Sequence, residues 1–194
     1  MKDFFVADFE FTQYSKPVGR PRGFFSEIIE IGAVRIDGDI QEISGVIQDF
    51  VKPHFYPKQA KEIMEFCSIT DAHMKTAIDF NTMLKKIEQL YVPDKTFFVT
   101  WGDGDFRVIE KGCERHNLIN PVLPEDCLDL AEAYKLLNDD SYTTGLRDAT
   151  EALNIKAEGF WHAAYEDAVK TGKILLKLLS DGWKPEHYFA LKKR

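Results

Sequence analysis

Two carboxylates stand two residues apart near the start of the chain, in the triplet Asp8-Phe9-Glu10. They follow the short apolar run Phe4-Phe5-Val6-Ala7, which is typical of a buried strand. Because residues i and i+2 of a strand project from the same face, the two acids converge and repel each other unless a cation or proton intervenes. Hard divalent ions such as Mg²⁺ are commonly held by one or two carboxylates together with phosphate oxygens. The triplet therefore predicts half of a metal site or, as the alternative, a strand that ends in two exposed acids.

A further acidic group follows the apolar run of residues 97–101, in the segment Trp101-Gly-Asp-Gly-Asp105. Ligand sites in open α/β sheets favour such strand ends, and the two glycines allow this turn to pass close to another group. Asp103 and Asp105 compete for the role of ligand. Either of them is equally compatible with a simple cap on the helix that follows.

The last reactive group is the segment Trp161-His162-Ala-Ala-Tyr-Glu166-Asp167. A helix is expected to begin just after His162, which puts Asp167 about one turn inside it, so that both side chains can face one cleft. A histidine with a pKa near ~6.5 accepts a proton from water at neutral pH. Glu166 is the rival of Asp167, but the two are ~100° apart around the helix, so only one faces the site squarely. Taken alone, His162 is also compatible with a structural or surface histidine.

The elements that must position these residues follow from the apolar pattern of the chain. Three antiparallel strands are predicted first, and Asp37-Gly38 is a two-residue hairpin signal between the second and the third. The predicted strands cover residues 4–11, 28–36, 43–51 and 96–101, with a short one near 127–130. The predicted helices cover residues 58–66, 79–91, 105–116, 131–137, 146–153 and 163–179, the last being stopped by Asp181-Gly182 and Pro185. This order predicts an α/β protein whose mixed central sheet is flanked by helices.

Length and composition limit the class of protein. With 194 residues, 44% hydrophobic and 29% charged, the chain is expected to form one globular domain over residues 1–194. No apolar run approaches the ~18 residues needed to span a bilayer, and no secretory signal is expected, so we predict no membrane association. The cysteines lack CxxC spacing and suggest reduced, mostly buried thiols in a cytoplasmic protein. They are Cys67, Cys113 and Cys127.

The net charge of −7 argues against a protein that coats nucleic acid with a broad basic face, but it allows an enzyme that grips a few nucleotides in a cleft. Basic residues gather in the segment 15–23, as Lys16, Arg20 and Arg22. These three are predicted either to guide a phosphate backbone or to form an ordinary solvated loop. The basic residues 192–194 are expected to form a frayed tail.

Together these groups resemble the DEDDh class of 3′→5′ exonucleases, which has a ribonuclease H-like fold. The matching motifs are Val6-Ala-Asp8-Phe-Glu10-Phe-Thr12, Trp101-Gly-Asp-Gly-Asp105 and His162-Ala-Ala-Tyr-Glu-Asp167-Ala, supported by Glu27-Ile-Ile-Glu30-Ile-Gly-Ala-Val34 and Phe50-Val-Lys-Pro53. Within the class, the chain looks like the Eri-type RNA exonucleases and the bacterial KapD-like proteins, over about residues 4–180. One departure is the segment Phe66-Cys-Ser-Ile-Thr70, which lacks the glycine of the family's Leu-Thr-Gly-Ile-Thr turn. Of the two aspartates in the second motif, the family pattern favours Asp105.

The resemblance implies an enzyme that hydrolyses the terminal phosphodiester at the 3′ end of a single-stranded nucleic acid, RNA rather than DNA, and releases 5′-mononucleotides. It implies His162 as the general base and two divalent ions, Mg²⁺ or Mn²⁺, held by four acids. These metal ligands, which are also catalytic residues, are Asp8, Glu10, Asp105 and Asp167. Contacts to the substrate are expected from Phe11, Thr12, Trp101, Arg20 and Arg22. The alternatives are a DNA-directed, proofreading-type exonuclease and a non-catalytic binding module with the same fold.

Overall fold

A five-stranded mixed sheet forms the centre of the protein in the computed structural model, which describes residues 1–14, 16, 18–156 and 158–192. The strands lie in the order β3-β2-β1-β4-β5. The three N-terminal strands are antiparallel, whereas β4 and β5 run parallel to β1, which confirms the predicted mixed sheet. The strand bounds are β1 Asp3–Phe11, β2 Ile28–Ile36, β3 Ile43–Phe50, β4 Thr96–Thr100 and β5 Cys127–Asp129.

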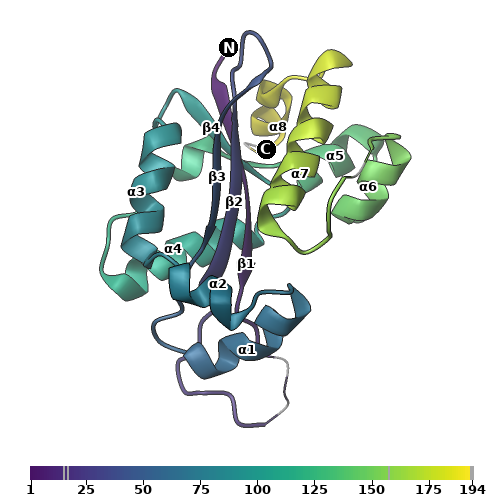
Figure 1. Cartoon of the computed structure of the whole chain (residues 1–194). Helices are drawn as coiled ribbons and strands as arrows, with labels where there is room; N and C mark the ends of the chain where they lie inside the picture. Colours follow the sequence, from purple (N-terminus) through teal and green to yellow (C-terminus); the bar gives the residue numbers. More distant parts are fainter. Residues whose placement is uncertain (15, 17, 157, 193–194) are drawn as a thin grey trace.

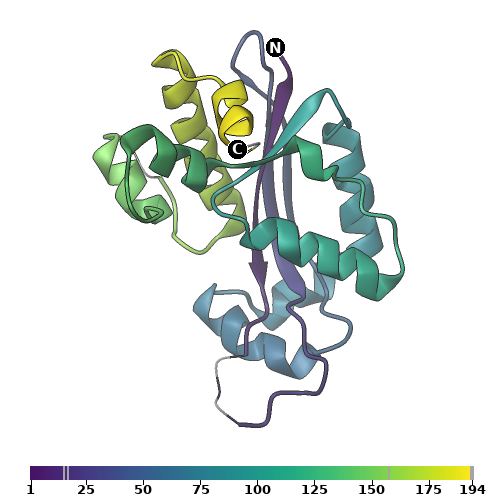
Figure 2. The ribbon, with the colours of Figure 1, turned by 180° about the vertical axis from the view of Figure 1, so that it is seen from behind.

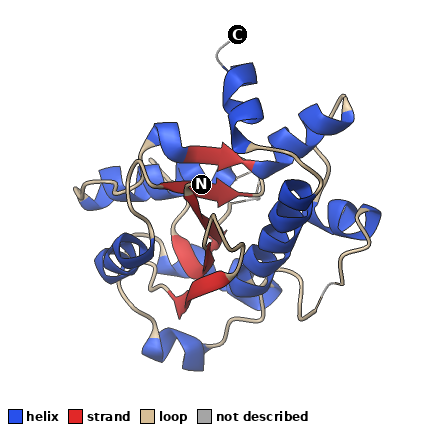
Figure 3. Cartoon of the chain, turned by 90° about the horizontal axis from the view of Figure 1, so that it is seen from above, coloured by secondary structure: helices blue, strands red, loops and turns tan. Residues whose placement is uncertain are grey.

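Helices cover both faces of this sheet (Figures 1 and 2). Helices α3 and α4 lie on one face, α7 lies against β1 and β2 on the other face, and α1 and α2 lie beyond one end of the central strands. The view from above shows how the twisted sheet is surrounded (Figure 3). The helices are α1 Pro57–Phe66, α2 Asp71–Thr76, α3 Phe80–Leu90, α4 Gly104–His116, the 3₁₀ helix η1 Pro124–Asp126, α5 Leu130–Asn138, α6 Leu146–Ala152, α7 Ala164–Ser180 and α8 Pro185–Lys192. Within the described ranges, none of these helices is both long and apolar enough to cross a bilayer.

The side chains of β1 alternate between two apolar clusters, one on each face of the sheet. Phe5, Ala7 and Phe9 pack with residues of α3 and α4. Phe4 and Val6 pack on the other face, with residues of α5 and α7. Phe9 is 3% exposed, which confirms that the middle residue of the acidic triplet belongs to the core. By the same alternation, Asp8 and Glu10 continue the row of Phe4 and Val6 toward the start of α7.

One glycine allows α7 to approach the sheet closely. Gly32 of β2 lies directly opposite Asp8 of β1 in the antiparallel pair. A methyl group on Gly32 would lie only 1.9 Å from the backbone nitrogen of Tyr165, in the first turn of α7. No side chain larger than hydrogen fits there, so the backbone of α7 begins directly above the strand position next to Asp8.

The connection between β2 and β3 has the predicted bounds but not the tight turn that Asp37-Gly38 signals. The hairpin is present, and its loop covers residues 37–42, the gap between the predicted strands 28–36 and 43–51. The carboxylate of Asp37 accepts backbone hydrogen bonds from Asp39 and Ile40 within this loop. Gly38 matters for another reason, because a methyl group there would lie 2.2 Å from the carbonyl oxygen of Lys2. Tertiary contact with the N-terminal segment, rather than a tight two-residue turn, explains this glycine.

Two α-helices were absent from the prediction. Helix α8 begins at Pro185, which the sequence predicts only as the stop of the preceding helix. Proline is well tolerated in the first turn of a helix, because the N–H that it lacks would have no partner within the helix. Helix α2 begins after Thr70, whose hydroxyl accepts a hydrogen bond from the backbone of His73 while the His73 ring accepts one from the backbone of Thr70. Lys192, expected in a frayed tail, lies in α8 with its Nζ 4.8 Å from the centre of the Tyr188 ring, and residues 193–194 lie outside the described residues.

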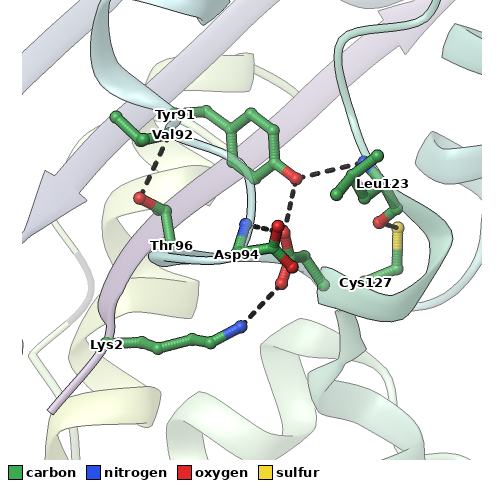
Figure 4. A network of polar contacts seen from close by, with 8 residues as sticks. Lys2, Tyr91, Val92, Asp94, Thr96, Leu123 and Cys127 are labelled. Carbon is green, nitrogen blue, oxygen red and sulfur yellow. Dashed lines mark hydrogen bonds and ion pairs between the residues drawn. The ribbon is translucent and has the colours of Figure 1, made fainter.

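At the end of the sheet where β1 begins, a buried polar network joins three segments (Figure 4). The carboxylate of Asp126, which is fully buried, accepts hydrogen bonds from Lys2 Nζ at 2.9 Å, the Tyr91 hydroxyl at 2.7 Å and the Asp94 backbone at 2.9 Å. The Tyr91 oxygen in turn accepts a hydrogen bond from the backbone of Leu123. This network holds the segments that lead into β1 and β4 against η1.

Candidate active site

The acids of β1 meet Asp105 at the C-terminal end of the strand. Asp105 lies in the first turn of α4 and is 7% exposed. Its Oδ1 accepts a hydrogen bond of 2.9 Å from the backbone of Phe9, the residue between Asp8 and Glu10. This bond ties the start of α4 to the strand that carries the acidic triplet.

Asp167 and His162 reach the same place from the opposite side of the strand end. Asp167 is 6% exposed in the first turn of α7, and its Oδ2 accepts a hydrogen bond of 3.0 Å from the backbone of His162. Ligand atoms of Glu10, His162 and Asp167 all lie within 4.8 Å of one another. Residues separated by more than 150 positions in the chain therefore converge on one site, as the sequence predicted.

The carboxylates of the site disfavour one another's ionised forms. Burial raises the pKa of Asp8 well above its ordinary value, and the negative charges of Asp105 and Glu10 raise it further. Burial raises the pKa of Asp105 to about 7, although the hydrogen bond from Phe9 works in the opposite direction. Burial also raises the pKa of Glu10, partly offset by a hydrogen bond from Cys67. These shifts are typical of acids brought together without a compensating cation.

This donor set fits a divalent metal ion. Glu10, His162 and Asp167 bring ligand atoms together, and Asp8 and Asp105 lie close enough for the charge of Asp105 to act on Asp8. Carboxylate oxygens are the ligands that Mg²⁺ and Mn²⁺ prefer. A cation among them would remove the repulsion that raises the pKa of Asp8 and Asp105.

Each rival residue of the sequence prediction is distinguished by its surroundings. Asp103 has a side chain that is 54% exposed and forms an ion pair with Arg107 on the outside of α4, whereas Asp105 points into the site. The carboxylate of Glu166 lies against Gly159, where a methyl group would overlap it, while its neighbour Asp167 is buried in the site. The acids at the two helix starts that lie next to the acids of β1 are therefore Asp105 and Asp167.

Among the residues expected to contact the substrate, Phe11 lies beside the site and Thr12 does not. The Phe11 ring is partly buried and lies next to Gly104, at the start of α4. Thr12 is fully buried, and its Oγ1 accepts a hydrogen bond of 2.9 Å from the backbone of Glu27. This hydroxyl therefore braces the segment that leads into β2.

Trp101 and the basic loop have structural partners. The Trp101 indole N–H donates a hydrogen bond of 3.0 Å to the carbonyl of Thr144, so it fixes the segment before α6. Arg20 is exposed, with its guanidinium 5.3 Å from the centre of the Phe24 ring, and Arg22 is exposed as well. Lys16 forms an ion pair with Glu62 of α1.

Three residues of the site were missed by the sequence prediction. Glu30 pairs with Glu10 across β1 and β2, and burial raises its pKa to about 7 while a hydrogen bond from the Ala164 backbone lowers it. The Cys67 thiol donates a hydrogen bond of 3.1 Å to Glu10 Oε2. Lys170 lies one turn after Asp167 and contacts it. Pairing register and helical spacing identify Glu30 and Lys170, but no local signal identifies Cys67.

The segment that departs from the family motif takes part in the site. Ser68 adopts a φ of 57°, the left-handed conformation that a glycine would adopt without strain. The turn of the Leu-Thr-Gly-Ile-Thr motif is thus retained with a serine at this position. Phe66, just before it, is 63% exposed, and its ring centre lies 4.5 Å from that of His162.

Comparison with known proteins places this chain in a family. The model of the exonuclease family matches residues 5–175. The chain belongs to the exonuclease family. It is 31% identical over 172 residues to the probable 3′-5′ exonuclease KapD of Bacillus subtilis, covering 87% of this chain and 80% of that protein. As the sequence predicted, the protein is a 3′→5′ exonuclease.

Two further relatives of this exonuclease agree with that assignment. Human ERI1 exoribonuclease 2 is 28% identical over 178 residues, which cover 80% of this chain and 26% of that protein. The nuclease domain of 3'hExo, a DEDDh family member solved with bound rAMP, superposes with a TM-score of 0.79 at 24% identity and covers 93% of both chains. This likeness confirms the predicted ribonuclease H-like exonuclease fold.

Proposed function

We propose that Asp8, Glu10, Asp105 and Asp167 hold two divalent metal ions and that His162 is the general base of the exonuclease. The observation that carries this proposal is the convergence of Glu10, His162 and Asp167 ligand atoms within 4.8 Å, beside an Asp8 whose ionisation its acidic neighbours oppose. When bound, such ions polarise the scissile phosphodiester and lower the pKa of water. We assign no preference between Mg²⁺ and Mn²⁺, because the carboxylate ligands suit both.

The residues of the chain have distinct tasks in this proposal. His162 accepts the proton of the attacking water, and its exposed side chain is reachable from solvent. Asp167 orients His162 through the hydrogen bond to its backbone and offers its remaining lone pairs to a cation. Asp105 is held by the Phe9 backbone in the same manner, so its carboxylate is fixed before any substrate arrives.

We propose single-stranded RNA as the substrate, released as 5′-mononucleotides, and a cytoplasmic location. The RNA assignment is supported by the exoribonuclease name of the human relative and by the rAMP bound to the 3'hExo domain. Phe11, which lies next to Gly104, and the exposed Phe66, which lies next to His162, offer aromatic rings on which a terminal base would stack. The location is supported by three cysteines that form no disulfide.

The test is a 3′-trimming assay on 5′-labelled single-stranded RNA and DNA of the same sequence, with Mg²⁺ or Mn²⁺. Wild type is expected to shorten the RNA stepwise from its 3′ end, whereas Asp8→Ala loses at least about 100-fold in rate. Asp103→Ala is the matched control, because it removes an exposed acid two positions from Asp105 and should leave the rate unchanged. Equal trimming by wild type and Asp8→Ala would refute the proposed site, and faster trimming of DNA than of RNA would refute the substrate assignment.

A further inference from the structure

Lys170 is a fully buried cation at the edge of the proposed active site. Its side chain is 1% exposed, although lysine is almost never buried without partners. The ammonium donates hydrogen bonds of 2.9 Å to Asp167 Oδ1 and 2.9 Å to the carbonyl of Phe160. Its Nζ also lies 4.4 Å from the centre of the Trp161 ring. An acid, a carbonyl and an aromatic face thus satisfy the three donors of one ammonium group.

These partners belong to the segment that ends in the proposed base. Lys170 holds the backbone of Phe160 and the ring of Trp161, and Asp167 holds the backbone N–H of His162. His162 adopts a φ of 60°, a conformation that is costly for a residue with a side chain and persists only where its surroundings enforce it. The contacts that enforce it converge on Lys170 and Asp167.

The His162 side chain depends on this backbone. His162 is exposed, and its ring contacts Phe66, which is itself 63% exposed. With little packing around the ring, the direction of its Cα–Cβ bond is set mainly by the backbone of residues 160–162. A base must lie within hydrogen-bond reach of the proton it accepts, so a backbone rotation there would displace it from the water.

We propose that Lys170 is a positioning residue for His162: its ammonium locks residues 160–162 onto α7 and so aims the imidazole at the acids. It does not touch the substrate. The proposal rests on the proposed function, since it requires His162 to be the base.

The first test compares the kinetics of Lys170→Gln and Lys170→Met with those of Lys177→Met. Lys177 is the control, because it lies on the same helix and forms an exposed ion pair with Asp181, far from residues 160–162. Misplacing a catalytic group by about 1 Å costs on the order of 100-fold, so both Lys170 variants should lose about 10- to 100-fold in kcat with KM within threefold of wild type. Lys177→Met should match wild type in both parameters. Glutamine can still donate a hydrogen bond to the Asp167 carboxylate. Lys170→Gln therefore remains a testable variant if Lys170→Met, which leaves the buried Asp167 without this partner, does not fold.

A double-mutant cycle separates positioning from general destabilisation. If Lys170 acts through His162, Lys170→Gln should cost less than threefold in a His162→Ala background, where there is no imidazole left to aim. The same 10- to 100-fold loss in both backgrounds would overturn the proposal. If His162→Ala itself trims RNA like wild type, the proposed function fails; if His162→Ala is impaired and Lys170→Gln is fully active, only the role of Lys170 fails.

A second readout needs neither metal nor turnover. In ¹H–¹³C spectra of the metal-free protein, the His162 imidazole signal is identified by its loss in His162→Ala. Lys170→Gln should shift or broaden this signal and leave the signal of His187, on α8, unchanged. An unchanged His162 signal in the folded variant would overturn the proposal.

Discussion

Burial and hydrogen bonding act in opposite directions on the pKa of Asp105. Burial between β1 and α4 disfavours the ionised carboxylate and raises its pKa to about 7, and the charge of Glu10 acts in the same direction. The hydrogen bond from the Phe9 backbone favours ionisation but does not compensate for burial. At neutral pH the metal-free site therefore retains part of its protons, and a cation that enters it competes with them.

This raised pKa makes the stability of the metal-free protein depend on pH. The unfolded carboxyl loses its proton near pH 3.8, whereas the folded one keeps it up to about pH 7. The folded state therefore binds more protons in this window, so the free energy of unfolding decreases as pH rises from 3.8 to about 7. Above pH 7 the full cost of the ionised, buried acid is present.

Asp105→Asn should remove this cost, because the amide cannot ionise and its oxygen can still accept the Phe9 hydrogen bond. In melts at pH 8 with EDTA, the variant should be more stable than wild type by about 1–3 kcal/mol, and near pH 4 the two should be equally stable. Added Mg²⁺ or Mn²⁺ should raise the Tm of wild type and raise that of the variant less. A wild-type Tm that does not change with either metal would contradict the proposed metal site. A variant that is less stable than wild type at pH 8 would contradict the raised pKa of Asp105.

At the scale of elements, the site depends on how closely α7 starts above the sheet. Gly32→Ala should place a methyl group 1.9 Å from the Tyr165 nitrogen and push the first turn of α7, with Asp167, away from Asp8. We expect a loss of about 1–3 kcal/mol in the free energy of unfolding, measured in urea, and a large loss of RNA trimming. The matched control is Gly172→Ala in the middle of α7, where the added carbon meets only the ends of the Ile36 and Val34 side chains, at 3.3 and 3.5 Å. Equal effects of the two substitutions would show that the start of α7 has no special role.

The elements also show what a single sequence reveals. The alternation of residues 4–11 predicted β1, its inward acids and the core position of Phe9, because a period of two is a local property. The bounds of the loop 37–42 followed from the flanking strands, but the reason for its glycine did not, because Gly38 contacts the backbone of Lys2, which lies before β1. Cys67 reaches Glu10 over 57 positions, and Ser68 takes a glycine-like φ for reasons of tertiary structure. Local patterns thus locate the acids of the candidate site, whereas contacts between distant segments decide which residues surround them.

For the whole molecule, the two ends of the sheet have different tasks. The end where β1 finishes collects mutually repelling acids, whereas the end where it begins holds Asp126 among hydrogen-bond donors. Burial acts to raise the pKa of Asp126, but hydrogen bonds from Lys2, Tyr91 and Asp94 outweigh it and hold the pKa below its usual 3.8. Since the folded pKa is depressed, this network stabilises the protein above pH 3.8, and its contribution is lost as the pH falls further. The hydrogen bonds at the beginning of β1 thus stabilise the fold, whereas the repelling acids at its end destabilise it.

Tyr91→Phe separates the two ends. The substitution keeps the buried ring but leaves Asp126 Oδ2 and the Leu123 N–H each short of one hydrogen bond, which should cost about 1–3 kcal/mol in urea unfolding at pH 7. Because Tyr91 lies at the opposite end of β1 from Asp8, kcat and KM for RNA at 25 °C should equal those of wild type. Tyr142→Phe is the control, since its hydroxyl is on an 85% exposed side chain and its removal should change neither quantity. A fall in kcat at a temperature where Tyr91→Phe is fully folded would show instead that the network at the beginning of β1 is coupled to the acids at its end.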